Sequence, residues 1–212
     1  MRRLDLPNIV TATRYPCALL FLLACAAGRP AWSAATLGLL ILTYLTDLLD
    51  GFLARRTPGR DARAGQVMDS AADSYTFVIV FTGLHLAGVV HPLVLCAVIG
   101  GRAVLDLTRL VGLARGERYL RPTVYTKTKG FVYCSLSIVL YAGTVPAFAW
   151  LGRDPLPAAA NTALVLATVA AVGSFLAVHR RHFLAMFAPI AAANPPITER
   201  LEHVDTQSPS RA

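Results

Sequence analysis

Charged residues are scarce in this chain: they make up 15% of its 212 residues, whereas 55% are hydrophobic and the mean hydropathy is +0.54. A soluble globular protein of this composition would have too little polar surface to cover its exterior. The composition therefore argues against an ordinary soluble domain and favours a polytopic membrane protein. The sequence also lacks a glycine-rich P-loop, so it gives no support to Walker-type nucleotide binding.

Cysteine is sparse too. The four cysteines are scattered through apolar segments and form no Cys-x-x-Cys pair, so neither a zinc site nor a disulfide framework is indicated. We interpret them as packing residues. The five histidines show no ligand spacing relative to the acidic residues, which leaves the carboxylates as the side chains with chemistry to explain.

Six apolar segments are long enough to cross a bilayer, for which a helix needs about 20 residues. They are residues 8–27, 32–55, 65–90, 92–114, 124–150 and 156–178. We therefore expect an all-α fold in which six transmembrane helices form a single domain over residues 1–188. The polar segment 189–212 contains several prolines and little apolar content, and it is predicted to be a disordered cytoplasmic tail.

Arginines gather at alternate ends of these segments. Six crossings place residues 2–3, 55–63, 115–121 and 180–181 on one side, whereas the opposite short turns hold only Arg29 and Arg153. By the positive-inside rule both termini face the cytoplasm, as does the loop between the second and third segments. The net charge of +8 then indicates contact with membrane lipids rather than with nucleic acid, and we expect the chain in the cell (inner or plasma) membrane.

Four aspartates lie against the apolar runs. Asp47 and Asp50 are three residues apart near the end of the second segment, and Asp69 and Asp73 are four residues apart near the start of the third. Either spacing places both carboxylates on one face of a helix. Because the intervening loop is short, the two faces are expected to meet just inside the cytoplasmic boundary, where an isolated carboxylate would be costly.

Such a cluster needs cations, because like charges about 4 Å apart repel by several kcal/mol even at an effective dielectric of about 20. Carboxylates and substrate phosphates are typical ligands of Mg²⁺, and two Mg²⁺ or Mn²⁺ ions would suit chemistry on a pyrophosphate. Two other interpretations stay open. A single aspartate can bond a neighbouring helix or an arginine, such as Asp47 with Arg14 or Arg102, and carboxylates between helices also mark divalent-cation transporters.

The order of these residues resembles a family signature, Asp-x2-Asp-Gly-x2-Ala-Arg followed by Gly-x3-Asp-x3-Asp. The matching positions are Asp47, Asp50, Gly51, Ala54 and Arg55, then, after nine residues, Gly65, Asp69 and Asp73. The chain thus resembles the CDP-alcohol phosphatidyltransferases. The resemblance implies a six-helix membrane enzyme, usually a homodimer, in which an acceptor hydroxyl displaces CMP from a CDP-linked lipid such as CDP-diacylglycerol at a two-metal site facing the cytoplasm.

The resemblance also implies roles for individual residues. Asp47, Asp50 and Asp69 would hold metal, and Asp73 would help to hold it or act as the general base. The residues that would line the pocket for the CDP-lipid are Gly51, Ala54, Arg55 and Gly65. Small residues also serve helix packing in membranes, and an arginine at the boundary can simply snorkel to the headgroups, so these four positions have a structural interpretation as well.

The opening "LPNIVTATRYP" is similar to the Pro-Asn-x2-Thr-x2-Arg of bacterial phosphatidylglycerophosphate synthases, which adds Asn8 and Thr11 to the CDP-lipid pocket. An anionic acceptor such as glycerol 3-phosphate would need cations for its phosphate. The candidates are Arg14, Arg102, Arg109, Lys127 and Lys129. Arg102 and Arg109 could instead pair with Asp106 on the same helix, and the lysines could be positive-inside residues.

Three positions of the chain depart from the pattern of those synthases, and they bear on the choice of acceptor. Ala103, Ser70 and Ser74 stand where those synthases usually carry glutamate, proline and lysine. Phosphatidylinositol-phosphate synthases share the core signature and also need a cationic pocket, because their acceptor carries a phosphate. A cardiolipin synthase of the family would use phosphatidylglycerol. Both stay open as alternatives to phosphatidylglycerophosphate synthesis.

Overall fold

The computed structural model describes residues 6–29, 33–56, 62–114, 124–185 and 187 of the chain. Within these ranges all regular secondary structure is helical, which confirms the predicted all-α class. The elements are α1 (Leu6–Ala27), α2 (Ser33–Arg56), α3 (Ala62–Leu86), α4 (Pro92–Ala114), α5 (Val124–Ala142), the 3-10 helix η2 (Pro146–Gly152), α6 (Leu156–Val178) and α7 (Arg180–Ala185). The predicted tail, residues 189–212, lies outside the described residues.

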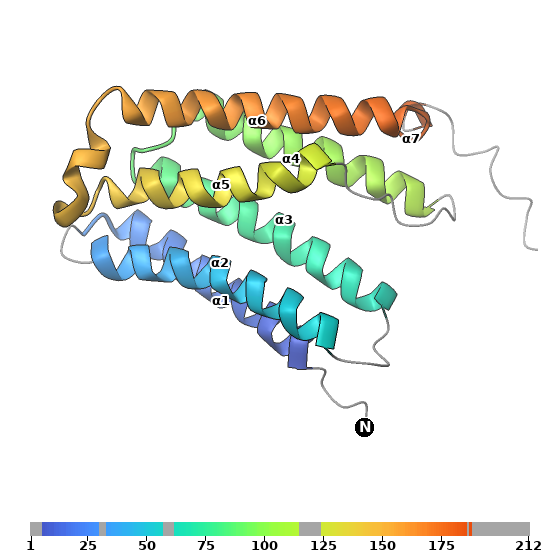
Figure 1. The fold of residues 1–212 in the computed structure, drawn as a ribbon, viewed down its shortest axis with the longest axis horizontal. Helices are drawn as coiled ribbons and strands as arrows, with labels where there is room; N and C mark the ends of the chain where they lie inside the picture. Colours follow the sequence, from blue (N-terminus) through green and yellow to red (C-terminus); the bar gives the residue numbers. More distant parts are fainter. Residues whose placement is uncertain (1–5, 30–32, 57–61, 115–123, 186, 188–212) are drawn as a thin grey trace, which may run out of the picture.

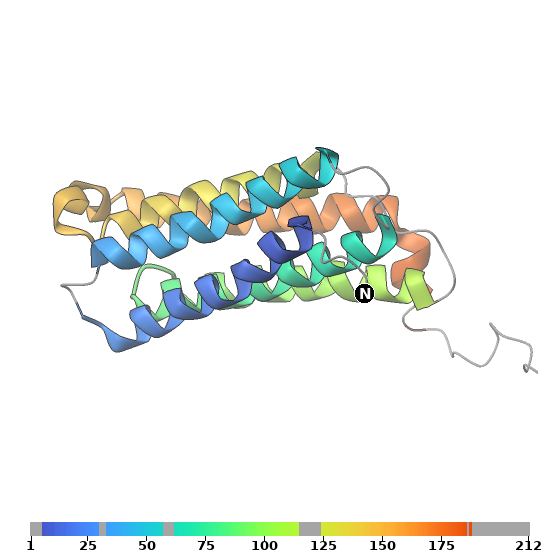
Figure 2. The ribbon, with the colours of Figure 1, turned by 90° about the horizontal axis from the view of Figure 1, so that it is seen from below.

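The long helices form an elongated bundle in which consecutive helices run in opposite directions (Figure 1). α1 packs against α2 and α3, and α6 packs against α4 and α5. α3 connects the two groups, since it contacts α4 and α5 as well. The view turned by 90° shows that the last turns of α2 and α4 and the first turns of α3 lie toward the same end of the bundle (Figure 2). We call this the site end, because α2 ends and α3 begins there.

Aromatic and aliphatic side chains fill the interior between the helices. Phe21, Phe81 and Tyr133 are almost completely buried, and the rings of Phe81 and Tyr133 meet edge to face with their centroids 5.3 Å apart. The Tyr133 hydroxyl also hydrogen-bonds the Thr168 hydroxyl on α6. Such interhelical hydrogen bonds between polar side chains are common in membrane bundles, so the core joins its helices by polar contacts as well as by packing.

The outside of the bundle is strongly apolar. Large hydrophobic side chains on every long helix are more than two-fifths exposed, including Leu23, Leu48, Leu93, Phe131 and Leu166. An exterior of this kind would be unfavourable in water, and it suits contact with lipid chains. The structure and the sequence therefore agree on a membrane-embedded protein.

Three helices are individually long and apolar enough to cross a membrane, namely Ile9–Ala27, Ser33–Leu53 and Leu156–Val178. A fourth span results if Thr128–Ala142 and Pro146–Gly152 are taken together across their 117° bend. α3 and α4 are not among these candidate spans, because the charged and polar residues at the site end make them less apolar. That all six long helices span the bilayer stays a prediction.

The predicted segment boundaries agree with the helices to within three residues except at two places. Segments 92–114 and 156–178 coincide with α4 and α6. The predicted segment 124–150 is wrong as a single helix: α5 ends at Ala142 and the chain turns sharply into η2. Gly143 lies so close to Gly152 that a Cβ there would come within 2.8 Å of the Gly152 nitrogen. α3 ends at Leu86, four residues early, because Gly88 takes a positive φ of 77°.

Candidate active site

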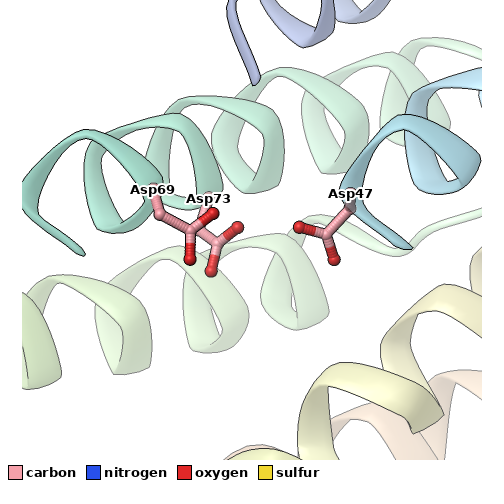
Figure 3. Close-up of side chains that lie close together, drawn as sticks. All are labelled: Asp47, Asp69 and Asp73. Atoms are coloured by element: carbon pink, nitrogen blue, oxygen red, sulfur yellow. The ribbon is translucent and has the colours of Figure 1, made fainter. Parts of the chain in front are cut away.

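Three aspartates converge at the site end. Asp69 and Asp73 extend from the first half of α3 toward Asp47 on α2 (Figure 3). One carboxylate oxygen of each lies within 4.8 Å of the others. Their side chains are 48%, 53% and 41% exposed for Asp47, Asp69 and Asp73, so a solute can reach all three. The predicted meeting of the two helix faces is therefore present.

Asp50 differs from the other three because its side chain is only 6% exposed. Its Oδ2 accepts a hydrogen bond of 2.8 Å from the Thr11 hydroxyl and one of 2.6 Å from Nη2 of Arg14. Both donors come from α1, which packs directly against α2. Asp50 therefore lies on the inner side of the aspartates, tied to α1. We refer to Asp47, Asp50, Asp69 and Asp73 together as the aspartate cluster.

Arg14 lies at the centre of the aspartate cluster with its side chain 1% exposed. Nη2 pairs with Asp47 and with Asp50, and it lies 3.7 Å from Asp69. Nη1 donates a 2.6 Å hydrogen bond to Oδ1 of Asp73. One guanidinium thus contacts carboxylates from both α2 and α3. The pairing of Asp47 with Arg14 that the sequence left open as a structural alternative is present in the structure.

The chemistry of these donors fits a divalent cation. Three carboxylates with oxygens within 4.8 Å of one another offer the hard oxygen ligands that Mg²⁺ and Mn²⁺ take. A guanidinium inserted among them shows that the cluster attracts positive charge. Exposure of about half of each side chain leaves room for water and substrate oxygens, which Mg²⁺ usually keeps as additional ligands.

Next to Asp73, a second polar network joins α3 to α4. Arg102 donates from Nε to Oδ2 of Asp106 at 2.8 Å and from Nη2 to the Ser74 hydroxyl at 2.8 Å. The Ser74 hydroxyl lies 2.6 Å from the same Asp106 oxygen, to which it donates. These three residues close a ring that fixes the direction of the guanidinium. Arg102 also reaches the backbone carbonyl of Ser70 at 3.2 Å.

Two further cations surround this network. Nη1 of Arg109 lies 3.5 Å from Oδ1 of Asp106. Nζ of Lys129, on α5, lies 5.6 Å from the centre of the Phe77 ring, and the Arg102 guanidinium lies 5.7 Å from the same ring centre. We call Arg102, Arg109 and Lys129 the cationic cluster. Lys129 is 5% exposed, and the side chains of both arginines are 11% exposed.

The cationic cluster gathers three cations around one described carboxylate. In the part of the chain that the structure describes, Asp106 is the carboxylate within 4 Å of these cations, and it pairs with both arginines. Two of the three cations thus pair with the same carboxylate among the described residues. Buried charges are unfavourable unless they are paired, so the cluster suits an anionic ligand.

The structure brings together some of the predicted site residues and separates others. Thr11 bonds Asp50 rather than standing free in a pocket, and Arg14 lies with the aspartates rather than with the other predicted acceptor cations. Gly51 is half-buried on α2. The side chains of the remaining predicted residues lie outside those that the structure describes: Asn8, Ala54, Arg55, Gly65 and Lys127.

Sequence reasoning missed the part played by Ser74. In the sequence, Ser74 stands out only because related synthases usually carry a lysine at this position. In the structure its hydroxyl links Arg102 and Asp106 across two helices. Helical spacing indicates only that Ser70 and Ser74 share one face of α3, and the partners on α4 follow from how the two helices pack.

A comparison with known families agrees with this site. Residues 4–173 match the family described as CDP-alcohol phosphatidyltransferase. The match covers well over half of the 212 residues, and the chain belongs to this family. Its members are transferases of phospholipid biosynthesis that use a CDP-alcohol donor and an alcohol acceptor and generally depend on a divalent metal. No curated relative and no solved structure matches the chain significantly.

Proposed function

We propose that the chain transfers a phosphatidyl group from CDP-diacylglycerol to the hydroxyl of a phosphorylated alcohol, with glycerol 3-phosphate as the expected acceptor. The observation that carries this proposal is the adjacency of two oppositely charged clusters. Asp73 belongs to the aspartate cluster, and Ser74, the next residue of α3, hydrogen-bonds Arg102 of the cationic cluster. A site that joins an activated pyrophosphate to an anionic alcohol needs both.

For the donor, we assign Asp47, Asp69 and Asp73 as ligands of Mg²⁺ or Mn²⁺, with Asp50 supporting them from the buried side. Two such ions would supply charge neutralisation of the pyrophosphate and of the departing CMP. Gly51, with no side chain, lets a flat ligand approach the α2 backbone. By their positions in the family signature, the further residues that we assign to the CDP-lipid pocket are Asn8, Thr11, Ala54, Arg55 and Gly65.

For the acceptor, we assign Asp73 as the general base. Its carboxylate is exposed enough to meet a hydroxyl and lies one residue from the serine that bonds Arg102. The acceptor oxygen forms a bond to the phosphorus that carries diacylglycerol while Asp73 takes its proton. The bond from that phosphorus to the bridging oxygen breaks, and CMP leaves with the electron pair.

The buried cations favour a phosphorylated acceptor over phosphatidylglycerol. A phosphate monoester carries about −1.5 to −2 charges at neutral pH, and the cationic cluster offers it three buried or nearly buried cations. The phosphodiester of phosphatidylglycerol carries a single charge and brings lipid tails as well. Inositol phosphate would satisfy the same cations as glycerol 3-phosphate, so phosphatidylinositol-phosphate synthesis is the second candidate. Lys127 is assigned to the same subsite because of its position on α5.

The membrane arrangement that we propose is six spanning helices, both termini in the cytoplasm and the site end facing the cytoplasm, in a homodimer in the cell membrane. The exposed arginines Arg56, Arg180 and Arg181 lie at the site end, and Arg29 and Arg153 at the other. This bias supports the cytoplasmic side. The apolar exterior of the bundle supports spans by α3, α4 and α5 in addition to the three most apolar helices.

The purified chain in detergent is expected to release CMP from CDP-diacylglycerol when Mg²⁺ and glycerol 3-phosphate are present together. The measurement is CMP formation and mass identification of the lipid product, with glycerol 3-phosphate, inositol phosphate and phosphatidylglycerol supplied in turn. Turnover with inositol phosphate alone would move the assignment to the second candidate. No turnover with any acceptor, together with metal flux into vesicles that contain the protein, would favour a cation transporter instead.

The Arg102→Gln substitution is expected to raise the KM for the phosphorylated acceptor by about 10- to 100-fold, since hydrogen bonds to charged groups contribute about 1.5–3 kcal/mol. The KM for CDP-diacylglycerol should change less, because Arg102 bonds Asp106 and the Ser74 hydroxyl rather than a carboxylate of the aspartate cluster. Steady-state kinetics with each substrate varied separately make the measurement. Arg180→Gln, an exposed arginine at the same end, is the matched control. Equal changes in both KM values would contradict the acceptor assignment.

A further inference from the structure

The carboxylates assigned to the metal already have a cationic partner within the chain. We propose that Arg14 is a resident counter-ion, which neutralises the aspartate cluster in the metal-free protein and competes with the metal. On metal binding it gives up Asp47, Asp69 and Asp73. It keeps Asp50. This inference rests on the proposed function, because it takes the three exposed aspartates as the metal ligands.

The partner that Arg14 keeps is buried, whereas the partners that it gives up are about half exposed. Arg14 and Asp50 are 1% and 6% exposed, and the Thr11 hydroxyl bonds the same Asp50 oxygen that Arg14 contacts. Removing one partner of a buried ion pair is strongly unfavourable, whereas exposed pairs contribute little. The other three aspartates are about half exposed. A metal arriving from solvent therefore meets the weaker contacts of the guanidinium first.

The geometry of the guanidinium supports a shared position. Nη2 of Arg14 contacts the carboxylates of Asp47 and Asp50. It also lies near Asp69, and Nη1 contacts Asp73. Nε is buried and has no hydrogen-bond partner among the described residues. A buried arginine that serves only to fix helices is expected to have its N–H donors satisfied. The unpaired Nε indicates that attraction to the carboxylates, rather than a complete set of hydrogen bonds, places the side chain.

The sign of the effect on metal affinity distinguishes this role from a merely structural one. If Arg14 competes, removing its charge takes away both an occupant of the carboxylates and a cation that repels the metal. Metal should then bind more tightly. If Arg14 only holds α1, α2 and α3 together, its loss would disorder the carboxylates, and metal should bind more weakly. The two roles predict opposite shifts in the same binding constant.

The test uses the full chain in detergent with Mn²⁺ alone as the probe, titrated by electron paramagnetic resonance. Arg14→Gln is expected to tighten Mn²⁺ binding by about tenfold, which corresponds to about 1.4 kcal/mol. Arg14→Lys keeps the charge but cannot form the guanidinium fork, so an intermediate shift is expected. In EDTA the Arg14→Gln protein should unfold at a lower temperature than the wild type. Saturating Mn²⁺ should reduce that difference.

Arg153→Gln, an exposed arginine at the opposite end of the bundle, is the control and should bind Mn²⁺ as the wild type does. If Arg14→Gln does not fold, Arg14→Lys carries the test. Unchanged or weaker Mn²⁺ binding in the folded variants overturns the counter-ion role and leaves the proposed function standing. A wild-type protein that binds no Mn²⁺ overturns both the counter-ion role and the metal site on which the proposed function depends.

Discussion

The Asp73→Asn variant is expected to lose about 10²- to 10⁴-fold in turnover, the range typical of a missing general base, while it still binds CDP-diacylglycerol. Asparagine has nearly the same shape as aspartate but takes no proton from the acceptor hydroxyl. Its amide oxygen can still accept the 2.6 Å hydrogen bond from Arg14, so the local packing should persist. Initial rates of CMP release measure the chemical step. Calorimetric titration of CDP-diacylglycerol into the variant measures donor binding.

Asp154→Asn is the matched control, since Asp154 is an exposed aspartate at the opposite end of the bundle. It should leave both turnover and donor binding unchanged. Full turnover of the Asp73→Asn variant would remove Asp73 from the role of base. A loss of donor binding that parallels the loss of turnover would indicate that Asp73 acts through the metal rather than on the acceptor.

Removal of divalent metal is expected to reduce CMP release to the background rate, and added Mg²⁺ or Mn²⁺ should restore it. Three carboxylates with oxygens within 4.8 Å of one another cannot approach a pyrophosphate unless cations neutralise both partners. The fold should nevertheless survive, because Arg14 pairs with the aspartate cluster without metal. CMP release and the thermal unfolding transition should both be measured after dialysis against EDTA.

EDTA that has been saturated with Mg²⁺ beforehand is the control for effects of the chelator itself, and it should leave turnover intact. Undiminished CMP release in metal-free buffer would contradict metal dependence. Loss of cooperative unfolding after EDTA treatment, with activity that metal then restores, would show that the metal is needed for folding. In that case Arg14 would not suffice as the neutralising group.

The helices could largely be predicted because long apolar runs separated by glycine and proline leave few alternatives. The exceptions have local causes. Gly88 has a positive φ and follows the last residue of α3 closely, so the helix stops before the end of the predicted segment. Gly143 lies close to Gly152 where the chain turns, and this turn divides the predicted fifth segment. Hydropathy averages over about 20 residues, and it cannot detect a bend that two or three residues produce.

The meeting of the aspartates could also be predicted, because helical spacing and a short loop determine it. The side-chain contacts that join different helices could not be predicted. Nothing in the spacing of Arg14 tells whether it faces the aspartates or the acceptor, since that depends on how α1 is rotated against α2 and α3. The link from Ser74 to Arg102 likewise depends on the packing of α3 against α4. A single sequence gives the phase of each helix but not the relative rotation of two helices.

The contacts of Arg14 bear on how the protein enters the membrane. α1 is made before α2 and carries an arginine that is buried in the finished bundle, and its partners Asp47 and Asp50 follow on α2. A lone arginine at the centre of a single inserted helix is unfavourable by about 2.5–3.5 kcal/mol on insertion scales, and by less nearer its end, where Arg14 lies. Insertion of the two helices as a hairpin lets opposite charges neutralise each other during translocation, and the third helix then completes the pairing through Asp73.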